Sequence, residues 1–124
     1  MGSRADERAG MTEGAQLLET GLEYVPGQPV LVSMRKRGYR YDIDDRGEAV
    51  RLAGTPRGWL EAAKRVVLEY SLNVNRAGVV FVQGYEWRWR DLDELAQRIA
   101  AASAALHAEL LELADEEPAR LKSG

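Results

Sequence analysis

The chain has 124 residues, contains no cysteine and carries a formal net charge of −3, with 45% hydrophobic residues. This length fits one domain, and the hydrophobic fraction is ordinary for a protein with a packed core. The lack of cysteine excludes disulfides, zinc–thiolate sites and a cysteine nucleophile. No stretch is long and apolar enough to span a membrane and no signal peptide opens the chain, so we expect a cytoplasmic protein.

Positive charge is concentrated in the middle of the chain. Residues 30–90 hold twelve Lys/Arg against seven Asp/Glu, whereas residues 1–29 hold two against five and residues 91–124 hold three against eight. A basic middle could steer an anionic partner, but charges that separate along a sequence can interleave in space. A solvated charged surface is the simpler interpretation.

The polar start of the chain precedes one domain. We expect residues 1–14 to be disordered, residues 15–116 to form a single domain, and residues 117–124 to form a flexible tail, because Pro118 should end any continuation of the last helix. Residues 16–22 are typical of a short helix that Gly21 ends. A loop rich in Pro and Gly follows.

The next segments alternate with period two. Residues 30–35 and 39–44 are predicted to be strands, joined by a tight turn at residues 37–38. Asp45-Arg46-Gly47 is typical of a second turn, because Asp bonds its own backbone and Gly accepts left-handed conformations. A third strand is predicted over residues 48–52.

A helix is predicted to begin at Pro56, because Thr55 can cap it and Pro suits the first helical position. Its apolar stripe is predicted to comprise Trp59, Ala63, Val66, Val67 and Tyr70. Residues 72–75 and 79–85 then read as a hairpin. A long helix without Gly or Pro is predicted from Leu92 to about Ala114. The fold class is therefore α+β: an antiparallel sheet flanked by helices, in the order α-β-β-β-α-β-β-α.

The acidic cluster Asp42, Asp44 and Asp45 is a candidate metal or catalytic site. A calcium loop starting at Asp42 fails, because Arg46 and Ala53 stand where ligands are needed. Asp42 and Asp44 share one strand face and could act as paired carboxylates. The favoured interpretation is structural: the residues make a turn, and Arg35, Arg37 or Arg40 pairs with them across the sheet. We expect no bound metal and no cofactor.

His107, the only histidine, has the hydroxyl of Ser103 one helical turn away. Nothing in the sequence supplies an orienting acid or an oxyanion hole for this pair, so it does not predict an active site.

Two further clusters are candidate contact surfaces. In the segment YEWRWR, the partner-binding candidates are Tyr85, Trp87, Arg88, Trp89 and Arg90, because Trp and Arg are common in binding hot spots; the alternative is that the aromatic residues are core. The basic segment Arg35, Lys36, Arg37 and Arg40 is a candidate nucleic-acid surface.

The final helix combines a broad apolar stripe with many alanines, which allow another helix to approach closely. We predict that part of it packs on a second copy or a partner, making a homodimer. The alternative is that the helix lies across its own sheet. The candidate interface residues are Leu95, Ile99, Ala102, Leu106, Leu110 and Leu113.

The run YRYDIDDRGEAVRLAG, a helix, LNVNRAGVVFV and a long Leu/Ala helix together resemble a prokaryotic domain family of unknown function. Its members carry an Asp-Asp-Gly-type strand turn, a helix and a hairpin of the form V-x-x-x-G-x-V-x-V. The resemblance covers roughly residues 30–114, and Arg46 interrupts the Asp-Asp-Gly. The matching positions are Tyr41, Asp44, Asp45, Gly47, Val74, Gly78, Val80 and Val82.

The order of the elements is also similar to that of small dimeric secretion chaperones, which bind partner polypeptides. This likeness concerns the fold and supplies no catalytic residues. We therefore expect a non-enzymatic protein-interaction or chaperone-like module, with nucleic-acid binding and a metal-dependent enzyme that uses Asp42 and Asp44 as the alternatives.

Overall fold

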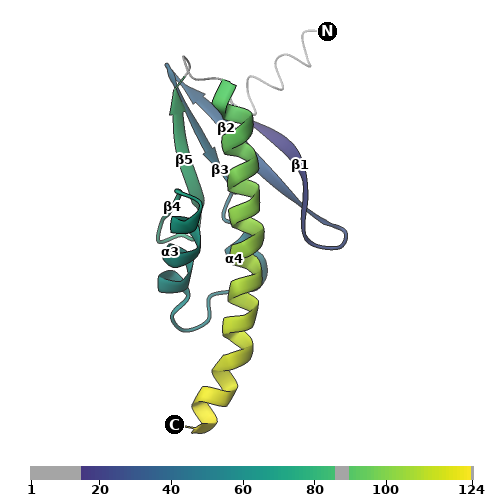
Figure 1. Ribbon diagram of the computed structural model, residues 1–124, viewed down its shortest axis with the longest axis vertical. Coiled ribbons are helices and arrows are strands. Elements are labelled where there is room, and N and C mark those ends of the chain that lie inside the picture. The colour runs from purple at the N-terminus through teal and green to yellow at the C-terminus, as the bar shows by residue number, and fades with distance from the viewer. Residues whose placement is uncertain (1–14, 86–89, 124) are drawn as a thin grey trace.

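The computed structural model describes residues 15–85 and 90–123, which form one antiparallel sheet and the helices that cover it (Figure 1). The strands follow the order β1-β2-β3-β5-β4 across the sheet. The α+β class and the antiparallel sheet are thus confirmed. In chain order the elements are β1 (Ala15–Val25), β2 (Gln28–Arg37), β3 (Arg40–Asp44), α2 (Glu48–Ala53), α3 (Trp59–Glu69), β4 (Asn73–Val74), β5 (Val80–Tyr85) and α4 (Arg90–Ser123).

The predicted order of elements matches closely, with two corrections. Residues 16–22 are part of β1 and not a helix, because pairing with β2 satisfies their backbone and overrides a local helical preference. Residues 48–52 belong to α2 and not to a strand. The turn at Asp45 leads the chain away from the sheet there, and Ala49 and Val50 are buried as helical residues.

Helix α3 begins at Trp59, three residues after the predicted first position, because Gly58 has a left-handed φ of 79° and is the N-cap in place of Thr55. The predicted apolar stripe of this helix is confirmed. Ala63 and Val67 are buried, and Trp59, Val66 and Tyr70 pack against the core.

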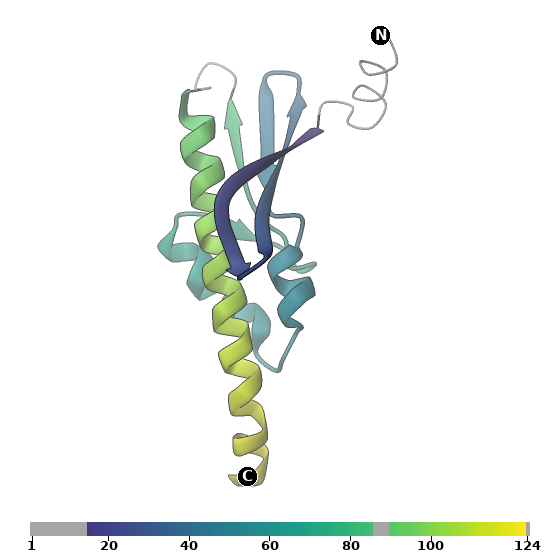
Figure 2. The same ribbon diagram turned by 90° about the vertical axis from the view of Figure 1, so that its right-hand side faces the viewer.

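Helix α4 lies along one face of the sheet, and its C-terminal part extends beyond the sheet (Figure 2). It continues through Pro118, where we predicted a flexible tail, to Ser123. Proline has a fixed φ of about −65° that is itself helical, so it removes a backbone hydrogen bond without having to end the helix. No helix in the described part of the chain has the length and apolar character needed to cross a membrane.

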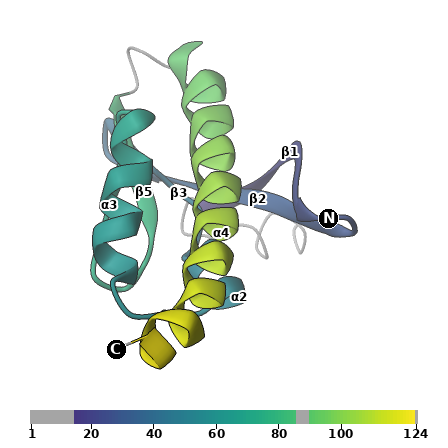
Figure 3. The same cartoon turned by 60° about the horizontal axis from the view of Figure 1, so that its bottom comes forward.

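The core lies between the sheet and α4. From the sheet, Val30, Val32, Ile43 and Val80 are fully buried, and they face side chains of α4 that are equally inaccessible to solvent. Helix α3 lies beside α4, and α2 contacts α4 further along its length (Figure 3). The described helices therefore cover one face of the sheet and leave the other face open.

Candidate functional site

The open face of the sheet carries a cluster of polar and aromatic side chains. Ile43 points into the core, so its neighbours Asp42 and Asp44 point to the opposite face. The register of β3 with β5 places Gln83 beside Asp42 and Phe81 beside Asp44. Residues directly opposite in an antiparallel pair point to the same face, so both acids share this face with an amide and an aromatic ring.

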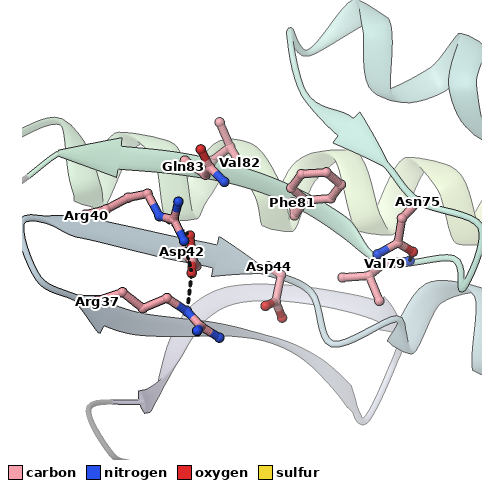
Figure 4. Close-up of a pocket in the computed structure, with 9 residues that line it drawn as sticks. All are labelled: Arg37, Arg40, Asp42, Asp44, Asn75, Val79, Phe81, Val82 and Gln83. Atoms are coloured by element: carbon pink, nitrogen blue, oxygen red, sulfur yellow. Dashed lines mark hydrogen bonds and ion pairs between the residues drawn. The ribbon is translucent and has the colours of Figure 1, made fainter.

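Asp42 lies at the centre of an ion-pair network on this face (Figure 4). Its Oδ2 atom is 2.6 Å from Nε of Arg37, and its Oδ1 atom is 3.1 Å from Nε of Arg40. Nη2 of Arg40 also donates to Oδ2 at 3.4 Å. The predicted pairing of Asp42 with neighbouring arginines is thus confirmed, and both guanidinium groups are held beside one carboxylate.

A shallow depression of about 310 Å³ lies next to this network (Figure 4). The half-buried ring of Phe81 supplies its apolar part, and the network supplies both signs of charge. The depression is lined by Arg37, Arg40, Asp42, Asp44, Asn75, Val79, Phe81, Val82 and Gln83.

Asp44 lies at the end of the same face and begins the turn into α2. Its Oδ1 atom accepts a hydrogen bond from the Arg46 N–H at 2.8 Å, as the turn interpretation predicted. Partial burial raises the pKa of Asp44 above its ordinary value, while this hydrogen bond and the charge of Arg35 oppose the rise. Asp44 therefore shapes the turn and leaves one oxygen for the open face.

Asp45 points to the covered side of the sheet and is fully buried. One of its oxygens accepts hydrogen bonds from the Gly47 N–H at 2.8 Å and the Val80 N–H at 2.9 Å. The other accepts one from Oγ of Ser103 on α4 at 2.6 Å. Burial raises the pKa of the Asp45 carboxyl, and these hydrogen bonds oppose the rise.

The three aspartates therefore do not converge on one point. Asp42 is held by two arginines on the open face, and Asp45 is enclosed on the other side. In residues 15–85 and 90–123, no three acidic or histidine side chains are grouped so that they could hold a metal ion.

Ser103 connects Asp45 to two further polar side chains. Its Oγ atom is 2.8 Å from the hydroxyl of Tyr24, whose ring centroid is 5.3 Å from that of His107. Burial raises the pKa of Tyr24 to about 12 and lowers the pKa of His107. The sequence showed no acid for the Ser103–His107 pair, because Asp45 is 58 residues away from Ser103 along the chain. Ser103 and Asp45 are both fully buried, so this network holds the core together and offers no surface to a substrate.

The predicted interface residues of α4 are mostly covered by their own chain. Ile99, Ala102, Leu106 and Leu110 have no exposed surface, and Leu95 and Leu113 pack against the same core. The sheet of the same chain covers the face of α4 on which we expected a second copy. For these residues, the structure agrees with the alternative that the helix lies across its own sheet.

The structure describes one of the two other predicted surfaces, the basic segment, and leaves most of the other, YEWRWR, outside the described residues. Residues 86–89 lie outside the described residues, as do the side chains of Tyr85 and Arg90, so the prediction for YEWRWR stays a prediction. The basic segment lies on the β2–β3 hairpin, where Arg35 and Lys36 are exposed. Its Arg37 and Arg40 are the two arginines that Asp42 holds.

Comparisons with protein families, with curated proteins and with solved structures find no match to this chain.

Proposed function

We propose that this chain is a non-enzymatic protein-interaction module of the cytoplasm, and that its open sheet face binds an extended segment of a partner polypeptide. The observation that carries the proposal is the contrast between the faces. One face is buried under helices, and the other presents Arg37, Arg40 and Asp42 beside the ring of Phe81. Arginine and aromatic residues are enriched where proteins bind one another.

The shape of the depression supports a polypeptide as the ligand. Small molecules usually bind in concave, mostly apolar pockets that cover most of their surface. Here the depression is shallow and lies on strands, so side chains of an extended segment could enter it while the segment runs over the sheet. The network offers a carboxylate and two guanidinium groups, which suit a segment that carries both signs of charge.

The segment YEWRWR fits the same proposal, because it begins at Tyr85, the last residue of β5, the strand that carries Phe81 and Gln83. Aromatic and arginine residues are the types that are common in binding hot spots.

Nucleic-acid binding is the second candidate, because one hairpin holds Arg35, Lys36, Arg37 and Arg40. It is less well supported, since Asp42 already neutralises part of this charge. A nucleic acid would have to compete with the carboxylate for two of the four cations.

A peptide-display selection against the whole chain tests the proposal. We expect selected peptides to bind the wild-type protein in fluorescence anisotropy and to lose about tenfold or more in affinity with Arg37→Asp, because this change reverses the charge of an exposed side chain in the depression. Lys64→Ala, at an exposed position of α3, is the matched control and should leave binding unchanged. Failure to enrich any peptide, or equal binding by both variants, would count against the open face.

A further inference from the structure

The outer edge of β1 is the longest unpaired strand edge in the described part of the chain. The sheet ends on one side with β1, which has 11 residues, and on the other with β4, which has 2 residues. An edge strand exposes a row of backbone N–H and C=O groups that can pair with another chain. The short β4 offers little of this row, whereas β1 offers a long one.

Exposed apolar side chains also gather on β1. Leu17 is 53% exposed, Leu22 is 36% exposed and Val25 is 45% exposed. The other exposed large hydrophobic side chains of the described residues lie apart from one another: Tyr39 in the β2–β3 turn, Leu68 on α3 and Leu111 on α4. Edge strands of monomeric proteins are usually protected by charged side chains, Pro or a bulge. Ala15–Glu19 has a single charged residue, Glu19 at its end, and neither a Pro nor a bulge.

A bulge limits the regular part of this edge. Pairing with β2 is regular from Ala15 to Glu19 and shifts between Glu19 and Glu23. There Gly21 has a φ of +82°, and the hydroxyl of Thr20 donates to the carbonyl oxygen of Val30 at 3.0 Å. A strand added to β1 can therefore pair with five residues before the bulge ends it.

We propose that a second copy of the chain adds to this edge, with its own Ala15–Glu19 antiparallel to the first and Leu17 on the two-fold axis. The two sheets would then form one continuous sheet. Leu17 would contact Leu17 of the second copy, and each Glu19 would lie opposite an Ala15. This inference does not rest on the proposed binding of a peptide by the open face.

Charge complementarity favours a second copy in this register. In the same chain, Ala15 pairs with Arg35 of β2. Glu19 of the second copy would lie on the other side of Ala15, so the Cα atoms of this Glu19 and of Arg35 would be two strand spacings, about 10 Å, apart. The small Ala15 side chain leaves room for the two long side chains to meet above it. Both are exposed, and among the described residues neither forms an ion pair within 4 Å. Arg35 lies opposite Asp42 in the register and its charge acts on Asp44, so Glu19 of the second copy would share this cation with them. Because the dimer is two-fold symmetric, it would contain this pair of Glu19 and Arg35 twice.

Neighbouring registers are less favourable. Centring the pairing on Glu19 would place two carboxylates directly opposite one another, which is destabilising. Centring it on Leu18 would place Gln16 opposite Thr20, at the start of the bulge. A two-fold axis at Leu17 lets all five residues of Ala15–Glu19 pair and places no like charges opposite one another.

Disulfide trapping tests the register, because the wild-type chain has no cysteine. Residues directly opposite in an antiparallel pair have Cα atoms about 4.5 or 5.5 Å apart, and both distances suit a disulfide. With oxidised glutathione, Leu17→Cys should form a covalent dimer at least about tenfold faster than Leu68→Cys, a control at a position that is 74% exposed. Equal rates for the two variants would overturn the proposal.

A charge swap tests the complementarity by sedimentation over a concentration series. Glu19→Arg and Arg35→Glu should each weaken dimerisation of the wild-type chain about tenfold or more, because each places like charges together. The double variant should regain the wild-type affinity, and circular dichroism confirms that each variant is folded. A wild-type chain that stays monomeric at every concentration, or a dimer that the single changes do not weaken, would contradict the inference.

Discussion

Asp42 and Asp45 lie three residues apart, yet their side chains are on opposite faces of the sheet and have different roles. Asp42 faces the open side, is 24% exposed at its side chain and is held by two guanidinium groups. Asp45 faces the core, has no exposed surface and is held by two backbone N–H groups and one hydroxyl. Residue type alone therefore does not indicate the role of a carboxylate; its partners and its access to water do.

The partners also determine how much each carboxylate contributes to the stability of the fold. An ion pair that water reaches contributes little to stability, because solvent screens it and the long side chains lose entropy. A buried acceptor with several donors contributes more, because its loss leaves those donors without partners and away from water. The covered face should therefore control folding, and the open face should tolerate substitutions that change what it binds.

The largest expected effect is that of Asp45→Ala. This change leaves two buried donors and the partly buried Gly47 N–H unpaired, so the free energy of unfolding should fall by about 3–5 kcal/mol. Asp44→Ala, which removes one hydrogen bond to the Arg46 N–H, should lower it by about 1 kcal/mol. Urea denaturation of both variants measures the difference. Equal losses would show that the two sides of the turn are equivalent.

Asp45→Asn refines the same comparison. The amide oxygen can still accept from Gly47 and Val80, and the amide N–H can donate to Ser103, whose hydroxyl then donates to Tyr24. The loss of stability should be clearly smaller than that of Asp45→Ala. If the two variants are equally unstable, the negative charge of Asp45 matters more than its hydrogen bonds.

The sequence predicted the sheet better than it predicted this network. Alternation placed Val30 and Val32 on one face of their strand and Ile43 opposite Asp42 on the next strand, because a strand has a fixed period of two. It also predicted that arginines near Asp42 would pair with it, since their positions on one hairpin are local in sequence. The network of Asp45 joins residues from β1, the turn before α2 and α4, and only the folded chain brings them together.

The two misassigned elements have a similar cause. The residues of β1 and α2 are compatible with either helix or strand over their short lengths, and tertiary contacts decide between the two. Residues 16–22 find a partner strand in β2, whereas residues 48–53 follow a turn in which Arg46 and Gly47 both have positive φ. A turn of that kind directs the chain off the sheet and onto α4.

A smaller effect should distinguish the faces at high pH. Burial raises the pKa of Tyr24 from 10.0 to about 12, so the folded chain favours the neutral phenol. The stability from this preference is complete below pH 10 and is lost as the pH rises towards about 12. The melting temperature of the wild-type chain should therefore fall towards that of Tyr24→Phe over this range. Tyr39→Phe, at a side chain that is 78% exposed, should show no such convergence.

The smallest effect on stability should come from Asp42→Asn on the open face, at about 0–1 kcal/mol in urea denaturation. The same change removes the charge that holds Arg37 and Arg40. If the carboxylate restrains these cations, the variant should bind a single-stranded oligonucleotide more tightly than the wild-type chain, with affinity that falls steeply as salt rises. Lys64→Ala should match the wild-type chain in both measurements.

The two results together separate the candidate ligands of the open face. Suppose that the wild-type chain does not bind the oligonucleotide and the variant binds it in a salt-dependent manner. Asp42 would then disfavour nucleic acid as a ligand of the open face, which would leave that face available to a polypeptide. Strong salt-dependent binding by the wild-type chain itself would favour the basic hairpin as a nucleic-acid surface. A large loss of stability in Asp42→Asn would contradict the comparison of the two faces, because Asp42 would then support the fold as Asp45 does.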